Sequence, residues 1–313
     1  MNPEIPNQNS NEAHLKRLLE SARSALSSDE QTKLQIVFRD KFIDYENANH
    51  VVVELMDALG RPVSERPPAF ALVGPSGGGK TAIVHQLLRR TKSMRPDSGD
   101  EDATLVLVVK TISRATEPRT WLSIARALNM TVPAGNARVP MNLGDTVIRR
   151  LKAKGVRMVV FSQFSHVEPV SRDERRNVFD LLQSMSDEGI IFVIVALERI
   201  MDLIGEEEEL VTRVTPLRVG ALAPIKRVTE KMSADEKRRA TEFLSFLMSL
   251  EAHYPFESES GLFRPEIAKP IYNHSKGIVG EVIRACNDAA RWAIKRGHKC
   301  ITPEALKAAG VPL

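Results

Sequence analysis

Short apolar runs and helically spaced apolar positions alternate along the middle of this chain. The helical spacing predicts helices at about 82–88, 118–129, 143–154 and 171–189. Short apolar runs predict five buried parallel strands, at 69–73, 104–109, 156–161, 190–196 and 214–219. Strands that alternate with helices are typical of an α/β fold, so we expect a parallel five-stranded sheet with helices on both faces.

The two ends of the chain show helical spacing only. Ahead of the sheet we expect helices at 12–26, from an N-cap at Ser28 to Phe38, and at about 47–59. After about residue 224 the pattern predicts a small helical lid, with helices at 234–252, 264–275, 278–296 and 303–309. The predicted domains are an N-terminal helical extension at 1–66, an α/β nucleotide-binding core at 67–222 and the helical lid at 223–313.

The first strand runs directly into a glycine-rich motif that is followed by a helix. The motif is Gly74-Pro75-Ser76-Gly77-Gly78-Gly79-Lys80-Thr81, which has the G-x-x-x-x-G-K-[ST] pattern of a P-loop. Glycines let backbone N–H groups turn toward phosphate oxygens, Lys80 would reach the β- and γ-phosphates, and the Thr81 hydroxyl would ligate Mg²⁺. A chance glycine-rich turn is the alternative, but the flanking strand and helix favour an ATP site.

Composition limits the other classes of protein. The chain has 313 residues, 42% of them hydrophobic, and only two cysteines, Cys286 and Cys300, without a C-x-x-C pattern. Neither a disulfide framework nor a zinc site is therefore indicated. There is no signal peptide and no apolar run of about 18 residues, so we expect a cytoplasmic protein without a membrane partner.

Positive charge is concentrated in one segment. The chain has a net charge of +4, but Lys110–Arg157 alone carries ten basic residues against Glu117 and Asp145. Such a segment is typical of a protein that binds a polyanion. The alternative for any single Lys or Arg is a solvated helix face.

Five segments resemble one known family. They are Phe42-Ile43-Asp44-Tyr45, Leu72-Val73-Gly74-Pro75-Ser76, Gly155-Val156-Arg157-Met158-Val159-Val160, Thr212-Arg213 and Gly277-Ile278-Val279-Gly280-Glu281. With the P-loop core and the helical lid, they make residues 13–310 resemble the AAA+ ATPases, most of all the transposition regulators TniB and TnsC, relatives of MuB. The resemblance implies an ATP-dependent protein that assembles on target DNA as a ring or helical filament and recruits or activates a transposase, together with a target-selector protein.

The resemblance also implies residue roles. Phe42, Ile43, Tyr45, Val279 and Gly280 would border the nucleotide, although ordinary interhelical packing is an equal alternative for Phe42 and Tyr45. Arg213 would be an arginine finger supplied in trans, with a surface arginine as the alternative. Lys110, Ser113, Arg114, Arg119 and Thr120 would contact double-stranded DNA, with Arg149 and Arg150 as weaker candidates. No aromatic or amide residues are interleaved to read base edges, so we expect little sequence preference.

The sequence departs from the family at the end of the third strand. Two acidic residues are expected there, one to hold Mg²⁺ through water and one to polarise the attacking water, but this chain has Ser162-Gln163. Leu197 also replaces a usual polar residue, and Gly280 stands where many AAA+ proteins have an arginine. We therefore expect ATP binding with weak or absent hydrolysis. Two alternatives remain: a competent ATPase that uses another carboxylate, and a secretion or signalling AAA+ module that binds no DNA.

Overall fold

The computed structural model describes residues 8–94, 103–131, 142–226, 229 and 232–313. The chain divides into two compact units. The α/β unit comprises His50–Ser76 and Lys80–Val219, and the helical unit comprises the chain up to Asn49, the loop residues Gly77–Gly79 and Gly220–Leu313. The predicted domain boundaries, 1–66, 67–222 and 223–313, stay a prediction.

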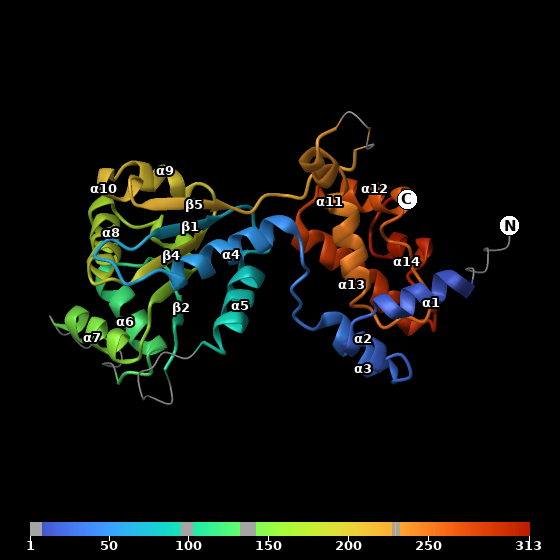
Figure 1. Ribbon diagram of the computed structural model, residues 1–313, viewed down its shortest axis with the longest axis horizontal. Helices are drawn as coiled ribbons and strands as arrows, with labels where there is room; N and C mark the ends of the chain where they lie inside the picture. The colour runs from blue at the N-terminus through green and yellow to red at the C-terminus, as the bar shows by residue number, and fades with distance from the viewer. Residues whose placement is uncertain (1–7, 95–102, 132–141, 227–228, 230–231) are drawn as a thin grey trace. The chain divides into compact units, whose positions relative to one another are not determined.

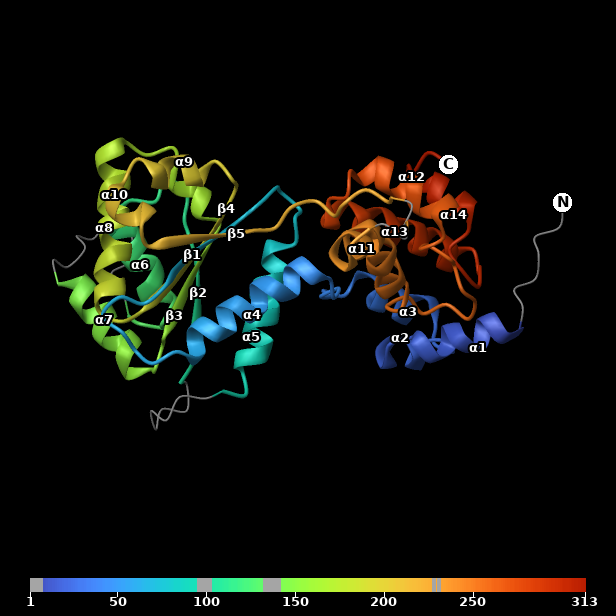
Figure 2. The same ribbon diagram turned by 45° about the horizontal axis from the view of Figure 1, so that its top comes forward.

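Five parallel strands form the sheet of the α/β unit, in the order β2-β3-β4-β1-β5 (Figures 1 and 2). In register, Val73 at the end of β1 pairs with Ala196 on β4 and with Arg218 on β5. The carboxyl ends of the strands therefore lie at one edge of the sheet. The strand bounds are β1 Ala69–Val73, β2 Val106–Lys110, β3 Met158–Ser162, β4 Ile191–Ala196 and β5 Val214–Arg218.

Helices cover both faces of this sheet, as the sequence predicted. Figures 1 and 2 show α6, α7 and α8 on one face and α5 on the other. Ser171 and Glu174 form a capping box at the start of α8, which satisfies backbone N–H groups at that helix end. The helix bounds are α5 Lys80–Thr91, α6 Glu117–Ala127, α7 Leu143–Ala153 and α8 Arg172–Asp187.

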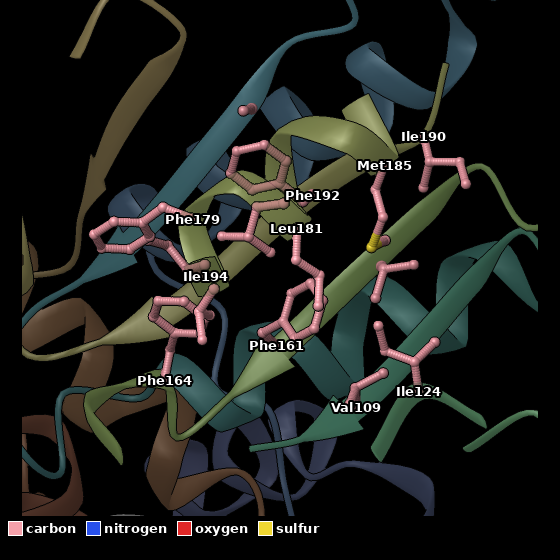
Figure 3. Packing of buried hydrophobic residues seen from close by; sticks show 14 of the residues in the cluster. Val109, Ile124, Phe161, Phe164, Phe179, Leu181, Met185, Ile190, Phe192 and Ile194 are labelled. Atoms are coloured by element: carbon pink, nitrogen blue, oxygen red, sulfur yellow. The ribbon is translucent and has the colours of Figure 1, made fainter. Parts of the chain in front are cut away.

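The core beneath α6, α7 and α8 is built from large aromatic and branched side chains (Figure 3). The ring centroid of Phe164 lies 6.0 Å from that of Phe161 on β3 and 6.3 Å from that of Phe179 on α8. Phe164 lies in a short 3-10 helix, η1, Phe164–Val167, directly after β3. Because Phe164 and Val167 are fully buried, they anchor the chain segment that leaves the end of β3.

The helical unit combines helices from both ends of the sequence. Glu251 joins them: its carboxylate accepts backbone N–H bonds from Ser260, Gly261 and Leu262, and His14 Nδ1 lies 4.0 Å away. Burial raises the pKa of Glu251, and the three N–H bonds oppose that shift. The helices are α1 Gln8–Arg17, α2 Glu20–Ser24, α3 Glu30–Phe38, α11 Ala234–Glu251, α12 Pro265–Ser275, α13 Val279–Lys295 and α14 Pro303–Ala308, and α4, Glu46–Gly60, begins here.

Two N-terminal predictions were wrong. The single helix expected at 12–26 is two helices, because Leu19 is extended, with φ −64° and ψ 151°, and its N–H donates to Ala252 O at 3.0 Å. The N-cap of α3 is Asp29 rather than Ser28, since the Asp29 carboxylate accepts the Thr32 N–H at 2.7 Å.

Other elements depart in smaller ways. The sequence did not predict η1 or the short helices α9, Ile200–Gly205, and α10, Glu208–Val211. Helical spacing predicts core packing for Trp121 and Trp292. Trp121 is buried, whereas Trp292 on α13 is only partly buried: it stacks on His298, and the Arg296 guanidinium lies 4.1 Å from its ring centroid. Residues 95–100, where Pro96 and Gly99 predict a turn-rich loop, lie outside the described residues. Among the helices that are described, none is long and apolar enough to cross a membrane.

Candidate nucleotide and DNA sites

The P-loop connects β1 to α5, as the motif requires. A Cβ atom on Gly74 would lie 2.1 Å from Val219 O, so only glycine fits at the start of the loop. Gly77 and Gly79 have φ of 73° and 88°, a conformation that favours glycine. The backbone therefore has the turns that a phosphate-binding loop needs.

Lys80 points back onto the loop that precedes it. Its ammonium donates to Gly74 O at 2.8 Å and to Pro75 O at 2.7 Å. Burial lowers the pKa of Lys80, because the ammonium loses water, and no carboxylate of the described residues forms an ion pair with it. A polyphosphate at this position would supply an anion. Thr81 is exposed in the first turn of α5, where its hydroxyl is available to a metal ion.

Tyr45 and two lid residues contact the glycines of the P-loop within the helical unit. The Tyr45 hydroxyl lies 3.3 Å from the position that a Cβ on Gly79 would take, and Val279 Cγ1 lies 3.8 Å from it. The Gly280 N–H donates to Gly77 O at 2.8 Å. Tyr45 is buried with its ring edge-on to Phe246, so interhelical packing accounts for its ring, and burial raises its pKa.

The hydroxyl of Tyr45 remains to be explained. It is buried and has no hydrogen-bond partner among the residues that the structure describes. A buried hydroxyl without a partner costs about 1–3 kcal/mol, which a polar group of a bound nucleotide would relieve. Ile43 is buried in the helical unit, whereas Phe42 is partly exposed. Within the P-loop, the glycine backbone and Lys80 fit the phosphates of a nucleotide.

The end of β3 carries no negative charge. Ser162 is the last residue of β3, and its hydroxyl donates to Val109 O at 3.2 Å. Gln163 is exposed and adopts a left-handed conformation with φ of 57°. A glutamine side chain cannot take a proton from water, and a serine adds no charge to a metal site. Thr81 is thus the one metal ligand that the predicted motif positions supply.

A carboxylate does lie nearby, at the end of the neighbouring strand β4. Glu198 accepts a bond from Arg218 Nε at 2.8 Å, and both side chains are more than half exposed. Because β1 lies between β4 and β5, this ion pair joins the two strands that flank the start of the P-loop. The sequence shows Glu198, but only the strand order reveals its pairing with Arg218.

Arg213 is also paired. Its guanidinium lies 2.9 Å from the carboxylate of Asp187, the last residue of α8, and its side chain is 23% exposed. The sequence alone does not indicate Asp187 as a partner of Arg213, because the two residues are 26 positions apart. The trans finger therefore stays a prediction, and it requires this ion pair to open.

The basic segment separates into exposed and structural residues. Lys110, Ser113, Arg114 and Arg119 are exposed around the start of α6, and Arg149 and Arg150 are exposed on α7. Thr120 differs from the prediction: it is buried, and its N–H donates to Thr116 O at 2.8 Å, so that N–H is not available to a phosphate.

Three other basic residues of the segment serve the fold. Lys152 pairs with Glu188, and Lys154 is buried. The Arg157 guanidinium donates to Leu59 O at 3.0 Å and Arg61 O at 2.6 Å, at the end of α4. Arg138 lies outside the described residues. Arg126, in the last turn of α6, is exposed as well. Within this segment, the exposed positive charge thus lies at the β2–α6 loop, at the end of α6 and on α7.

Comparisons with known proteins agree with this geometry. The family described as Bacterial TniB protein matches residues 33–222. Solved structures that resemble the chain include Cdc6p from Pyrobaculum aerophilum, with a TM-score of 0.59 and 16% identity, and the Aeropyrum pernix ORC2 protein, with 0.60 and 12%. Each comparison covers 88% of this chain and 70% of the other.

A third structure contains a nucleic acid. The Aeropyrum pernix ORC1 protein in complex with DNA has a TM-score of 0.59 and 16% identity, over 88% of this chain and 68% of that one. These likenesses show the fold, that of an AAA+ P-loop NTPase, and confirm the predicted fold class. No curated protein matches this sequence.

Proposed function

The chain belongs to the TniB family, and on this premise we propose that it is an ATP-binding regulator of DNA transposition that assembles on double-stranded DNA and recruits or activates a transposase. The observation that carries the proposal is the basic loop between β2 and α6. Lys110, Arg114 and Arg119 are exposed there, in the same α/β unit as Lys80. Guanidinium and ammonium groups bind phosphate oxygens without reading bases, so target binding has little sequence preference.

Nucleotide binding would switch assembly on. The P-loop backbone and Lys80 hold the phosphates, and Thr81 ligates Mg²⁺, which neutralises phosphate charge when it is bound. With Ser162 and Gln163 in place of two carboxylates, the chain lacks the usual group that activates water. The ATP-bound state therefore lasts long, and it is reset by dissociation or by partner proteins rather than by rapid hydrolysis.

The DNA site can be tested by salt titration. We expect Lys110→Ala with Arg114→Ala to weaken binding to duplex DNA, measured by fluorescence anisotropy in ATP. Each phosphate contact contributes about −0.9 to the slope of log K against log salt, so the slope should decrease by roughly two. The matched control is Arg89→Ala with Arg90→Ala, which removes two exposed charges from α5. Equal slopes for the two double variants would place the DNA contact elsewhere.

Assembly can be tested by electron microscopy. An arginine finger acting in trans needs a head-to-tail interface, and such an interface closes into a ring or continues as a helix. We expect rings or filaments when ATP and duplex DNA are both present, and dispersed particles without ATP. Equal assembly with and without duplex DNA would favour a secretion or signalling AAA+ module instead.

A further inference from the structure

The segment after β3 holds both ends of the basic loop that follows β2. At one end of the loop, the Thr111 N–H donates to Ser162 O at 3.0 Å, and His166 Nδ1 lies 2.9 Å from Thr111 O. At the other end, the Ala115 N–H donates to His166 O at 3.2 Å. His166 therefore contacts the loop twice, once through its ring and once through its backbone.

The loop between these contacts has a shape that its own sequence does not favour. Arg114 has a φ of 49°, in the left-handed region that a non-glycine residue enters at a cost of about 1 kcal/mol or more. The loop Thr111–Thr116 contains no glycine. A conformation of this kind persists when surrounding contacts determine it, and the hydrogen bonds at Thr111 and Ala115 do so. Arg119 adds one more, from Nη1 to Arg114 O at 3.3 Å.

His166 lies in a segment that is anchored in the core. It belongs to η1, whose Phe164 and Val167 are fully buried in the core. Thr111 O is a carbonyl and can only accept, so the His166 ring must carry its proton on Nδ1. Thr111 is buried, and its hydroxyl finds no hydrogen-bond partner within the described part of the chain. Thr111 is thus held through its backbone, by the bond that its N–H donates to Ser162 O and by the bond that its carbonyl accepts from the His166 ring.

We propose that His166 is a positioning residue for DNA binding: it holds the loop so that Arg114 and Lys110 meet the phosphates of double-stranded DNA. This inference rests on the proposed function. The end of β3, where the acidic pair is missing, would then support the β2–α6 loop directly. The segment Ser162–His166 joins the edge of the sheet that carries the P-loop to the residues that meet DNA.

Three variants of His166 test the proposal. His166→Ala removes the ring bond to Thr111 O, and loss of one such bond should weaken duplex DNA binding about three- to tenfold while ATP affinity stays unchanged. His166→Asn should retain most of the affinity, because its Nδ2 reaches about the position of the histidine Nδ1. His166→Gln places its amide one bond farther out and should resemble His166→Ala. DNA binding is measured by anisotropy and ATP binding by calorimetry.

A double-mutant cycle separates positioning from general stability. When Lys110→Ala and Arg114→Ala are already present, His166→Ala should add less than twofold, because the side chains that it positions are gone. Equal DNA binding by His166→Ala and wild type, or a full additive loss in that background, would overturn the positioning role. If Lys110→Ala with Arg114→Ala still lowers the salt slope, the proposed function survives that result. If the wild type itself binds no duplex DNA, both proposals are wrong.

Discussion

The carboxyl ends of β1 and β3 lie at the same edge of one sheet, but they carry different chemistry. β1 leads into a complete P-loop with Lys80 and with glycines in the conformations that phosphate binding needs. β3 ends at Ser162, which is followed by Gln163, and neither residue brings a negative charge. Binding a nucleotide and hydrolysing it therefore depend on separate parts of this edge, because binding uses backbone N–H groups and a cation whereas hydrolysis needs a carboxylate.

The surroundings of each strand end follow the same division. The Lys80 ammonium donates to two loop carbonyls, which carry only partial negative charge. A polyphosphate would offer it oxygens with full negative charge instead. Ser162 and Gln163 instead take part in the structure around the β2–α6 loop, through Ser162 O and the turn into η1. In this chain the end of β3 thus serves the architecture of the proposed DNA site.

The largest expected effect tests the intact end. Lys80→Ala removes the one full positive charge that the motif aims at the β- and γ-phosphates. Charge-assisted hydrogen bonds contribute about 1.5–3 kcal/mol each, so ATP affinity should fall about 100-fold or more by calorimetry. Arg90→Ala, on the exposed side of the same helix, is the control and should bind like wild type. Equal affinity of Lys80→Ala and wild type would remove the basis of the comparison.

The second effect tests the altered end. Ser162→Asp with Gln163→Glu restores both acidic groups, and phosphate release should rise at least about tenfold, toward the ~100-fold that a positioned general base contributes. Ser162→Ala with Gln163→Ala changes the same two positions without adding charge and should leave the rate near that of wild type. If both double variants hydrolyse ATP equally slowly, the missing acids are not what limits turnover.

The third effect concerns the pairing of Arg213 with Asp187. Arg213→Ala should weaken ATP-dependent oligomerisation several-fold, seen by light scattering, while a folded monomer remains. Asp187→Asn should do the opposite, because it frees Arg213 and removes a negative charge from the C-terminal end of α8, where the helix dipole disfavours it. Exposed ion pairs contribute about 0.2–1 kcal/mol, so the gain should be no more than about fivefold. Assembly of Arg213→Ala like wild type would mark Arg213 as a structural residue.

Much of the α/β unit could be predicted from local pattern. Each strand is a short apolar run that ends in polar or turn residues, and each large helix repeats its apolar positions every three or four residues, so local sequence carries both signals. The break at Leu19 could not be found this way, because its N–H bonds to Ala252, more than 230 residues away. Apolar periodicity continues through the break and conceals it.

The candidate sites also differ in how much of each could be predicted from local sequence. The P-loop is contiguous, so Gly74 to Thr81 could be identified from the sequence. The roles of charged residues depend on partners that only folding brings near: Asp187 for Arg213, Leu59 and Arg61 for Arg157. A run of basic residues therefore indicated a polyanion partner, but it could not separate the exposed Arg114 from the structural Arg157.

The smallest expected effect asks whether another carboxylate replaces the missing pair. Glu198 is the obvious candidate, since its strand β4 lies beside β1, but its carboxylate is bound to Arg218 and more than half exposed to water. Because the ion pair with Arg218 occupies this carboxylate, Glu198→Gln should change steady-state phosphate release less than twofold, with Glu208→Gln in α10 as the control. A tenfold loss specific to Glu198→Gln, with ATP affinity unchanged, would show that the edge has moved its catalytic carboxylate from β3 to β4. The end of β3 would then lack a catalytic carboxylate because that group lies after β4 instead, and the protein would not have lost the chemistry of hydrolysis.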